Sequence, residues 1–182
     1  MSDRTSAPGP SVVVIDGNPQ PSSRTASVGR RLGERLAELV AGGSPDQAGR
    51  VELVSLSELG PGLLQWGDES VARAKALVLS ATIVVVATPT YKATYTGLLK
   101  LFLDQFGAGE LAHVRAVVPL MTGGGPGHSL AVDVHLRPVL VEIGARVPTA
   151  GLYVWGEQID EPDEVLEAWL ATETEVVRRQ LG

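Results

Sequence analysis

Hydroxyl side chains, amides and glycines gather in three short stretches of this sequence. The first, residues 17–25, contains Ser22, Ser23 and Thr25 just before a segment with helical periodicity. Because backbone N–H groups at the start of a helix carry partial positive charge, this stretch suits a phosphate group. It contains neither the Gly-x-Gly-x-x-Gly fingerprint of dinucleotide-binding folds nor the Gly-Lys-Ser/Thr signature of nucleoside triphosphate hydrolysis. The residues predict a phosphate site, with a Pro-rich turn capped by Ser or Thr as the structural alternative.

The second stretch, residues 88–97, contains Tyr91 and Tyr95, two of the three tyrosines in the chain. Aromatic side chains on a loop of small polar residues suit a flat ring ligand. They can equally cover the helix that follows, and the sequence alone leaves both interpretations open.

The third stretch, residues 122–128, is rich in glycine and ends at His128. Glycines allow backbone amides to approach a ligand closely, and such donors suit a ring edge that carries carbonyl oxygens. A histidine in this position more often starts or packs a helix than acts as a catalyst. Together the three stretches predict a site for a phosphorylated ligand with a flat ring, as FMN has.

These stretches must be positioned by the apolar segments around them. The segments typical of strands covered on both faces are residues 12–15, 51–56, 83–87, 114–121 and 147–155. The segments with helical periodicity are residues 24–40, 69–79, 97–106, 129–143 and 163–181. The alternation predicts a doubly wound α/β domain with a five-stranded parallel sheet. Ligands bind beyond the carboxyl ends of such strands, so the three stretches should converge there.

Two of the predicted helices have unusual features. Apolar residues surround the segment 97–106 on every side, which indicates a helix that is central or shared with another subunit. Leu98, Leu101, Phe102 and Phe106 cannot all face one sheet, so we expect an interface. In the segment 129–143, Pro138 removes one backbone donor and should distort the preceding turn.

Composition limits the class of protein. We expect one domain, residues 11–182, behind a flexible leader of residues 1–10, with Gly42 and Gly43 ending the first helix. The longest apolar run, residues 83–87, is too short for a membrane helix, and no signal segment opens the chain. Zero cysteines exclude disulfides and iron–sulfur ligation, and a net charge of −6 disfavours nucleic acid. We expect a cytoplasmic protein that binds no membrane and no metal.

The three stretches also match a known family pattern. The matching residues of the first are Gly17, Pro19, Ser23, Arg24 and Thr25. In the second they are residues 87–92, Gly97, Leu99 and Lys100, and in the third Thr122, Gly123, Gly124, His128, residues 130–133 and residues 137–140. With these motifs the sequence resembles the NADPH-dependent FMN reductase family, especially the reductases of two-component alkanesulfonate monooxygenase systems.

This resemblance implies a flavodoxin-like sheet of strand order 2-1-3-4-5 and an NAD(P)H-dependent FMN reductase. FMN and NAD(P)H would be its cofactors, and a flavin-dependent monooxygenase its partner. The family assembles as homodimers or homotetramers through the helices after the third and fourth strands. Hydride passes from nicotinamide to flavin without a protein nucleophile, so no catalytic acid or base is assigned. The candidate cofactor-binding residues are Asn18, Gln20, Ser23, Arg24, Thr25, Pro89, Thr90, Tyr91, Tyr95, Thr122, Gly123, Gly124 and His128.

The sequence departs from the family pattern in two places. Asn18 and Gln20 replace the usual Ser and Arg of the phosphate loop, and losing the Arg removes a charge-assisted hydrogen bond worth about 1.5–3 kcal/mol. Val134, followed by His135, stands where the alkanesulfonate reductases insert an aromatic residue, usually Tyr. We therefore expect weak FMN binding, colourless protein and release of reduced flavin. The alternatives are a quinone, azo-dye or chromate reductase that retains FMN, and a non-enzymatic flavodoxin-like electron carrier.

Overall fold

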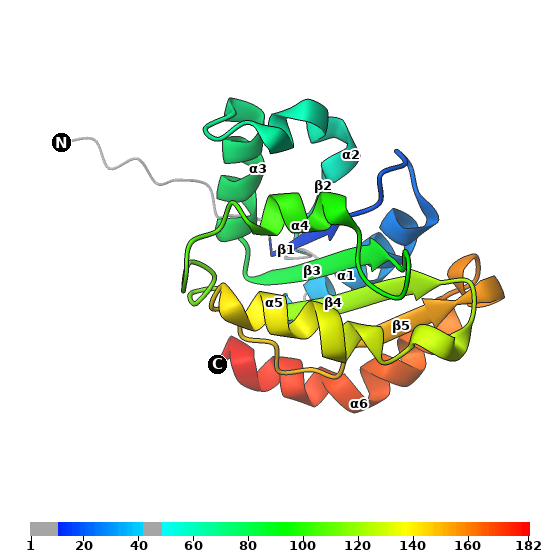
Figure 1. Cartoon of the computed structure of the whole chain (residues 1–182). Helices are drawn as coiled ribbons and strands as arrows, with labels where there is room; N and C mark the ends of the chain where they lie inside the picture. Colours follow the sequence, from blue (N-terminus) through cyan, green and yellow to red (C-terminus); the bar gives the residue numbers. More distant parts are fainter. Residues whose placement is uncertain (1–10, 42–48) are drawn as a thin grey trace.

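Five parallel strands form the middle layer of the molecule in the computed structural model, which describes residues 11–41 and 49–182 (Figure 1). The strands are β1 (Val12–Asp16), β2 (Val51–Ser55), β3 (Ile83–Pro89), β4 (Ala116–Gly123) and β5 (Leu152–Trp155). Their order in the sheet is β2-β1-β3-β4-β5, which confirms the expected flavodoxin-like topology. The expected leader, residues 1–10, and the expected helix-ending Gly42 and Gly43 lie outside the described residues.

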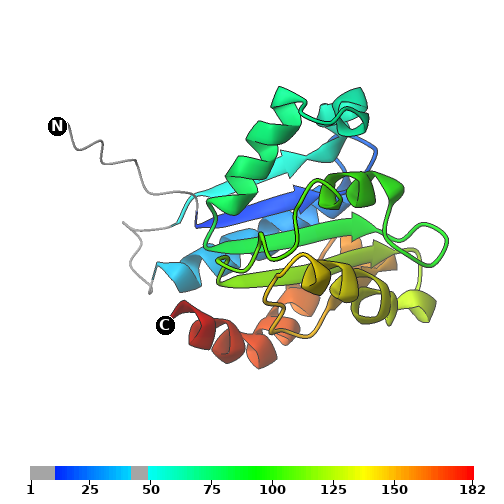
Figure 2. The same cartoon turned by 60° about the vertical axis from the view of Figure 1, so that its left-hand side comes forward.

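Helices cover both faces of the sheet (Figure 2). The helices on one face are α1 (Arg24–Val40) and α6 (Asp163–Leu181), and those on the other are α3 (Glu69–Leu79), α4 (Gly97–Leu103) and α5 (Arg137–Glu142). Side chains alternate between the faces along a strand, so Val12 and Val14 of β1 join one core cluster while Val13 and Ile15 join the other. This double burial explains why the strand is uniformly apolar.

The helices α1, α3 and α6 have the bounds that the sequence predicted. Ser23 caps α1 by accepting the N–H of Ala26, and Asp68 caps α3 by accepting the N–H groups of Ser70 and Val71. Such caps satisfy N–H groups that have no partner within the helix, and they fix where the helix begins. Short helices that the sequence did not predict are α2 (Leu56–Leu59), η2 (Gly60–Leu64) and η5 (Gly156–Ile159).

Helix α4 is shorter than predicted, because it ends at Leu103 instead of residue 106. Phe106 therefore lies beyond the helix and folds back edge-on against Phe102, with ring centroids 5.4 Å apart. Both rings are buried in the core, Leu98 packs partly buried against it, and Leu101 is exposed at the surface. The four side chains thus do not all face the sheet, which agrees with the expectation, and the two phenylalanines pack within one subunit.

The predicted helix 129–143 is divided into three pieces. A 3₁₀ turn, η3 (Pro126–His128), comes first, and a π-helical turn, η4 (Val132–Leu136), leads into α5. Pro138 has no N–H to continue the regular ladder, and a wider turn precedes it. The expected distortion before Pro138 is confirmed.

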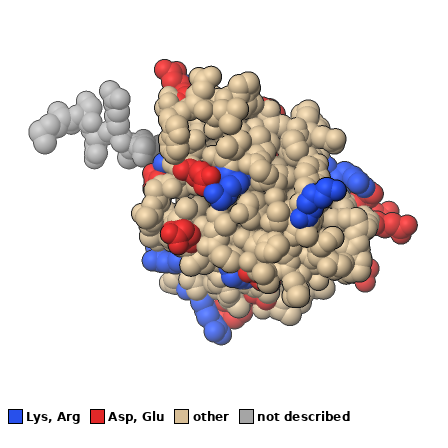
Figure 3. Space-filling view, viewed as in Figure 1, with Lys and Arg blue, Asp and Glu red and all other residues tan. Residues whose placement is uncertain are grey.

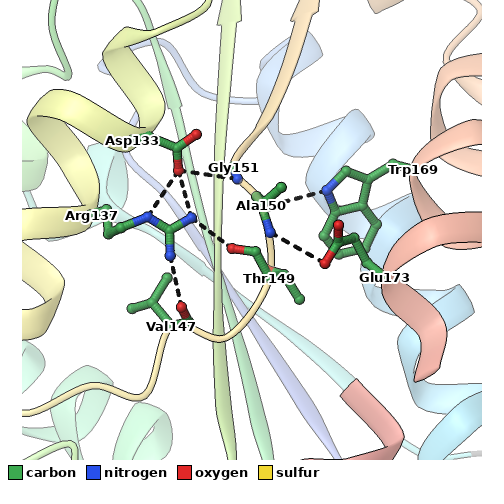
Figure 4. A network of polar contacts seen from close by, with 8 residues as sticks. All are labelled: Asp133, Arg137, Val147, Thr149, Ala150, Gly151, Trp169 and Glu173. Atoms are coloured by element: carbon green, nitrogen blue, oxygen red, sulfur yellow. Dashed lines mark hydrogen bonds and ion pairs between the residues drawn. The ribbon is translucent and has the colours of Figure 1, made fainter. Parts of the chain in front are cut away.

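Strand β5 starts at Leu152 and not at residue 147, because side chains hold the segment before it (Figure 4). Arg137 donates to the carbonyls of Val147 at 2.7 Å and Thr149 at 2.6 Å, while Asp133 accepts from Arg137 and from the N–H of Gly151. These bonds take the place of sheet pairing. None of the helices in the described ranges is long and apolar enough to cross a membrane.

Candidate functional site

The carboxyl ends of the strands open on a cavity of about 600 Å³, on the side to which the arrowheads in Figure 1 point. A volume of this size suits a cofactor or a small ligand. Four loops line it, and they follow β1, β3, β4 and β5. Every candidate residue except Tyr95 and His128 lies in the lining, namely Asn18, Gln20, Ser23, Arg24, Thr25, Pro89, Thr90, Tyr91, Thr122, Gly123 and Gly124.

The loop after β1 is supported from beneath by a buried carboxylate. Asp16 accepts the N–H of Asn18 at 3.1 Å and the hydroxyl of Ser23 at 3.1 Å. Gly17 leaves little room for a side chain, since a Cβ there would lie 3.0 Å from the Cβ of Leu99. The loop thus lies close against α4 and presents the N-terminus of α1 to the cavity.

The loop after β3 doubles back on itself. Tyr91 and Thr94 form an antiparallel bridge in which the N–H of Tyr91 donates to the Thr94 carbonyl at 2.9 Å. Lys92 and Ala93, between them, have positive φ angles of 52° and 68°, as in a tight two-residue turn. The bridge holds Tyr91 at the cavity with 47% of its surface exposed.

Hydroxyl groups fix the loops to one another. Thr96 caps α4 by accepting the N–H of Leu99, and its hydroxyl donates to the carbonyl of Gly17 at 2.6 Å. The hydroxyls of Thr25 and Thr122 lie 2.7 Å apart. The loops after β1, β3 and β4 are therefore joined before any ligand binds, which favours a preformed site.

Two polar side chains lie next to the end of β4, the phenol of Tyr153 and the hydroxyl of Thr90. A Cβ on Gly123 would overlap the hydroxyl of Tyr153, which donates to the carbonyl of Gly125 at 3.1 Å. The hydroxyl oxygen of Thr90 is buried and has no hydrogen-bond partner among the described residues. Buried hydroxyls are normally paired, so this one suits a polar atom of a ligand.

The fourth loop, after β5, was missed by the sequence analysis. Gly156, Glu157, Ile159 and Asp160 line the cavity, and Asp160 forms an ion pair with Arg24 at 3.1 Å. The signal was available: the fifth strand was predicted to end at residue 155, so the residues after it had to reach the same edge of the sheet.

The structure separates the two tyrosines that the sequence had grouped. Tyr91 lies at the cavity, whereas Tyr95 is half-buried against the core. His128 is exposed at the end of η3 and outside the lining. The packing interpretation applies to Tyr95, and the ring-ligand interpretation stays a prediction for Tyr91.

The charges at the cavity are few and mostly acidic. The lining contains one basic side chain, Arg24, beside the acidic Glu157 and Asp160, and it contains no histidine or lysine. Burial raises the pKa of the Asp16 carboxyl to about 6, against the smaller lowering by the N–H of Asn18 and the hydroxyl of Ser23. The described part of the chain also contains no cluster of three acidic or histidine side chains that could hold a metal ion.

The arrangement can bind an anion at one end and a flat ring at the other. The N-terminus of α1 and the amides of the first loop offer donors to the anion. The ring end is formed by Pro89, Thr90 and Tyr91 on one loop and by Thr122, Gly123 and Gly124 on another. Because the lining pairs no nucleophile with a base, its chemistry must come from what it binds.

Comparison with known proteins agrees with this geometry. A family model described as NADPH-dependent FMN reductase matches residues 10–160. The NADH-dependent FMN reductase SfnF of Pseudomonas putida is 30% identical over 155 residues, which cover 82% of this chain and 80% of that protein. The FMN reductase (NADPH) of Pseudomonas putida KT2440 is 41% identical over 83 residues, and the alignment covers 46% of this chain and only 42% of that protein.

Among solved structures, the apo form of the NADH:FMN oxidoreductase EmoB is similar over almost its whole length. The TM-score is 0.78 at 31% sequence identity, and the superposition covers 95% of this chain and 90% of that chain.

Proposed function

This chain belongs to the NADPH-dependent FMN reductase family, and we propose that it is an NAD(P)H-dependent FMN reductase that releases reduced flavin to a partner monooxygenase. The observation that carries the proposal is the preformed cavity at the carboxyl edge of the sheet. There a helix N-terminus, two linked threonine hydroxyls and glycine amides face one space of suitable volume.

The residues present fit FMN at both ends. The phosphate would be held at the start of α1 by backbone amides and by Ser23 and Thr25, whose positions satisfy the requirements of an anion site. The ring would lie between the second and third loops, where the unpaired hydroxyl of Thr90 would gain a partner from a ring oxygen or nitrogen. Tyr91, half exposed, would border the side open to a second ring.

When bound, FMN supplies an electron-accepting ring to which reduced nicotinamide delivers a hydride. The chain contributes binding and orientation. The Thr25–Thr122 contact fixes the distance between the phosphate loop and the ring loop, and the Arg24–Asp160 ion pair joins the loops after β1 and β5. No side chain is assigned a proton-transfer role.

The electrostatics favour FMN as a substrate that leaves over FMN as a permanent group. Gln20 stands where the family has Arg, and Arg24 is already paired with Asp160. Glu157 adds a further negative charge at the cavity. A phosphate there depends on amides and hydroxyls, whose hydrogen bonds are weaker than those to a guanidinium. We infer moderately weak binding and colourless purified protein.

We also propose a homodimer or homotetramer. Leu130, Val134 and Val141 are 74%, 60% and 54% exposed; Leu130 lies just before η4, Val134 in η4 and Val141 in α5. Figure 3 shows this side of the molecule, where broad areas without charged side chains separate a few acidic and basic groups. Exposed apolar residues in such an arrangement usually mark an interface.

The function is tested by measuring NAD(P)H oxidation with a catalytic amount of the protein and an excess of FMN. Retention of flavin is then measured after dialysis. We expect flavin-dependent turnover well above the free-flavin background and loss of flavin on dialysis. A yellow, stoichiometric flavoprotein with ping-pong kinetics toward a quinone would support the retaining reductase instead. Folded protein that binds FMN without oxidising NAD(P)H would support the electron carrier.

A further inference from the structure

A carboxylate that the proposed reaction does not use lies directly behind the phosphate loop. Asp16 is the last residue of β1 and has no exposed surface. Its hydrogen-bond donors are the N–H of Asn18, at 3.1 Å, and the hydroxyl of Ser23, at 3.2 Å and 3.1 Å from the two carboxylate oxygens. A buried carboxylate is normally neutralised by a cation or by a proton.

The residues around Asp16 provide no such cation. Its partners on the neighbouring strands, Ser55 of β2 and Ala87 of β3, are uncharged. At the near ends of α1 and α2, Arg24 is paired with Asp160 and Glu58 is exposed. The other charged residues of α1 lie further along the helix, from Arg30 onward, and Lys100 of α4 is paired with Asp104. Burial consequently raises the pKa of Asp16 to about 6, opposed only by its two hydrogen bonds.

The single hydrogen of the Ser23 hydroxyl is committed while Asp16 is ionised. Its hydrogen is donated to Asp16, and its oxygen accepts the N–H of Ala26 at 3.0 Å. A hydroxyl has one hydrogen and two lone pairs, so Ser23 lines the cavity with no hydrogen left for a phosphate. When Asp16 is protonated, the carboxyl O–H can donate to the second lone pair of Ser23, and the hydroxyl hydrogen becomes free to turn toward the cavity.

We propose that Asp16 is a positioning residue that couples phosphate binding to the uptake of one proton, and so sets the preference of the site for FMN over riboflavin. The inference rests on the proposed flavin site. One proton passes from solvent to a carboxylate oxygen of Asp16, and the Ser23 hydroxyl exchanges its bond to Asp16 for one to a phosphate oxygen. No covalent bond to the ligand forms. The same proton removes a negative charge that opposes the phosphate.

The test compares the dissociation constants of FMN and riboflavin, measured by quenching of flavin fluorescence from pH 5 to pH 8. The proteins are the wild type, Asp16→Asn and the matched control Asp68→Asn, which changes an aspartate that caps α3 outside the cavity. Selectivity is the riboflavin constant divided by the FMN constant. The phosphate of FMN itself ionises near pH 6 and affects the selectivity of both proteins equally. Dividing the wild-type selectivity by that of Asp16→Asn cancels this effect.

We expect this quotient to be at least tenfold lower at pH 8 than at pH 5, because above its pKa Asp16 must take up a proton when FMN binds. Asp68→Asn should behave as the wild type. Calorimetry in buffers of different ionisation enthalpy gives a second readout. At pH 7.5 the wild type should take up nearly one proton more than Asp16→Asn on binding FMN, and neither should do so with riboflavin.

An unchanging quotient, or equal proton uptake by both proteins, would overturn the role of Asp16 and leave the reductase proposal standing. Folded wild-type protein that binds neither flavin would overturn both. Asp16→Ser is a second neutral, hydrogen-bonding variant, and it must give the same quotient if Asp16→Asn fails to fold.

Discussion

Asn18 makes hydrogen bonds through both its backbone and its side chain. Its N–H donates to Asp16, its side-chain oxygen accepts the N–H of Gln20 at 3.0 Å, and its amide nitrogen lies 3.5 Å from the hydroxyl of Thr25. The side chain of Asn18 thus stabilises the loop from within. Gln20 is exposed beside it and lines the cavity, so a substitution of its side chain should not disturb the packing of the protein.

We expect Gln20→Arg to lower the dissociation constant of FMN about tenfold, while that of riboflavin changes little. A guanidinium at this position adds a charge-assisted hydrogen bond to the phosphate, and tenfold corresponds to about 1.4 kcal/mol. Fluorescence titration with both flavins measures the effect, with Gln65→Arg, outside the cavity, as the control. Equal tightening of both flavins would mean that residue 20 does not face the phosphate.

Gly123→Ala should weaken flavin binding about tenfold and destabilise the fold by about 1–3 kcal/mol. The added methyl group overlaps the phenol of Tyr153, whose hydroxyl bond to Gly125 fixes the third loop. Flavin titration and urea denaturation measure the two effects. Gly127→Ala is the matched control, since nothing lies within 4 Å of a Cβ there. Equal behaviour of the two variants would contradict the assigned packing.

The buried carboxyl also predicts how stability depends on pH. The folded-state pKa of Asp16, about 6, is above the ordinary 3.8, so the folded chain binds the proton more tightly than the unfolded chain. Its contribution to stability is complete below about pH 4 and is lost as the pH rises through 6. The difference between the two values corresponds to about 3 kcal/mol at most.

Asp16→Asn should therefore be more stable than the wild type at pH 8, with the gain vanishing near pH 4. Urea denaturation at a series of pH values measures it. Asp68→Asn provides a control of opposite sign, because the hydroxyl of Ser70 and the N–H of Val71 lower the pKa of Asp68. A stability gain of Asp16→Asn that does not change with pH would disprove the assignment.

The sequence predicted most of the cavity lining, because polar residues that directly follow buried strands must lie at one edge of a parallel sheet. It could not predict the direction of a side chain within a loop. Tyr95 points to the core because the Tyr91–Thr94 bridge reverses the chain just before it. Glu157 and Asp160 were not predicted as lining residues because they belong to no motif, although their position after a strand was predictable.

At the level of elements, the π-helical turn η4 is fastened to the strand that follows α5. Arg137 reaches two carbonyls before β5, and Asp133 on η4 accepts from both Arg137 and Gly151 (Figure 4). On the other side of the same segment, the indole of Trp169 donates to the Ala150 carbonyl at 3.1 Å. The loop between α5 and β5 is thus held from both faces of the sheet.

Arg137→Met should destabilise the protein by about 2–4 kcal/mol. The substitution keeps the aliphatic stem but leaves the carbonyls of Val147 and Thr149 without their charged donor. Chemical denaturation measures the loss, with Arg179→Met on α6 as the control for removing an exposed arginine. A loss no larger than that of the control would show that water replaces the guanidinium.

Periodicity predicted the long helices well because each has a clear apolar stripe and a side-chain cap or a charged first turn. It failed where a side chain replaces backbone pairing. The predicted strand included residues 147–151, yet Arg137 binds the carbonyls of Val147 and Thr149, and this contact leaves no trace in local sequence. Phe106, which was predicted within the same helix, lies beyond its end at Leu103 and packs on Phe102.

At the scale of the whole molecule, the exposed apolar side chains are unevenly distributed. Leu130, Val134 and Val141 lie on the η4–α5 side, whereas α6 on the opposite face exposes charged residues such as Arg178 and Arg179. This contrast indicates which surface would associate with a second copy.

Val134→Asp should convert the proposed dimer or tetramer to a monomer, because a carboxylate buried in an apolar interface loses its hydration. Light scattering at micromolar concentration, with and without FMN, measures the mass. Ala171→Asp on α6 is the matched control and should leave the assembly intact. A monomeric wild type would refute the interface.

The cavity draws its walls from residue 18 at one end of the chain and residue 160 near the other, with β1 in the interior of the sheet and β5 at its border. No N-terminal fragment contains the complete lining. A chain emerging from the ribosome therefore acquires its flavin pocket only when the last strand and the loop behind it have been made and docked. Flavin binding during synthesis would show that all five strands have paired, although α6 is made later, and the ligand cannot act as a template for the earlier strands.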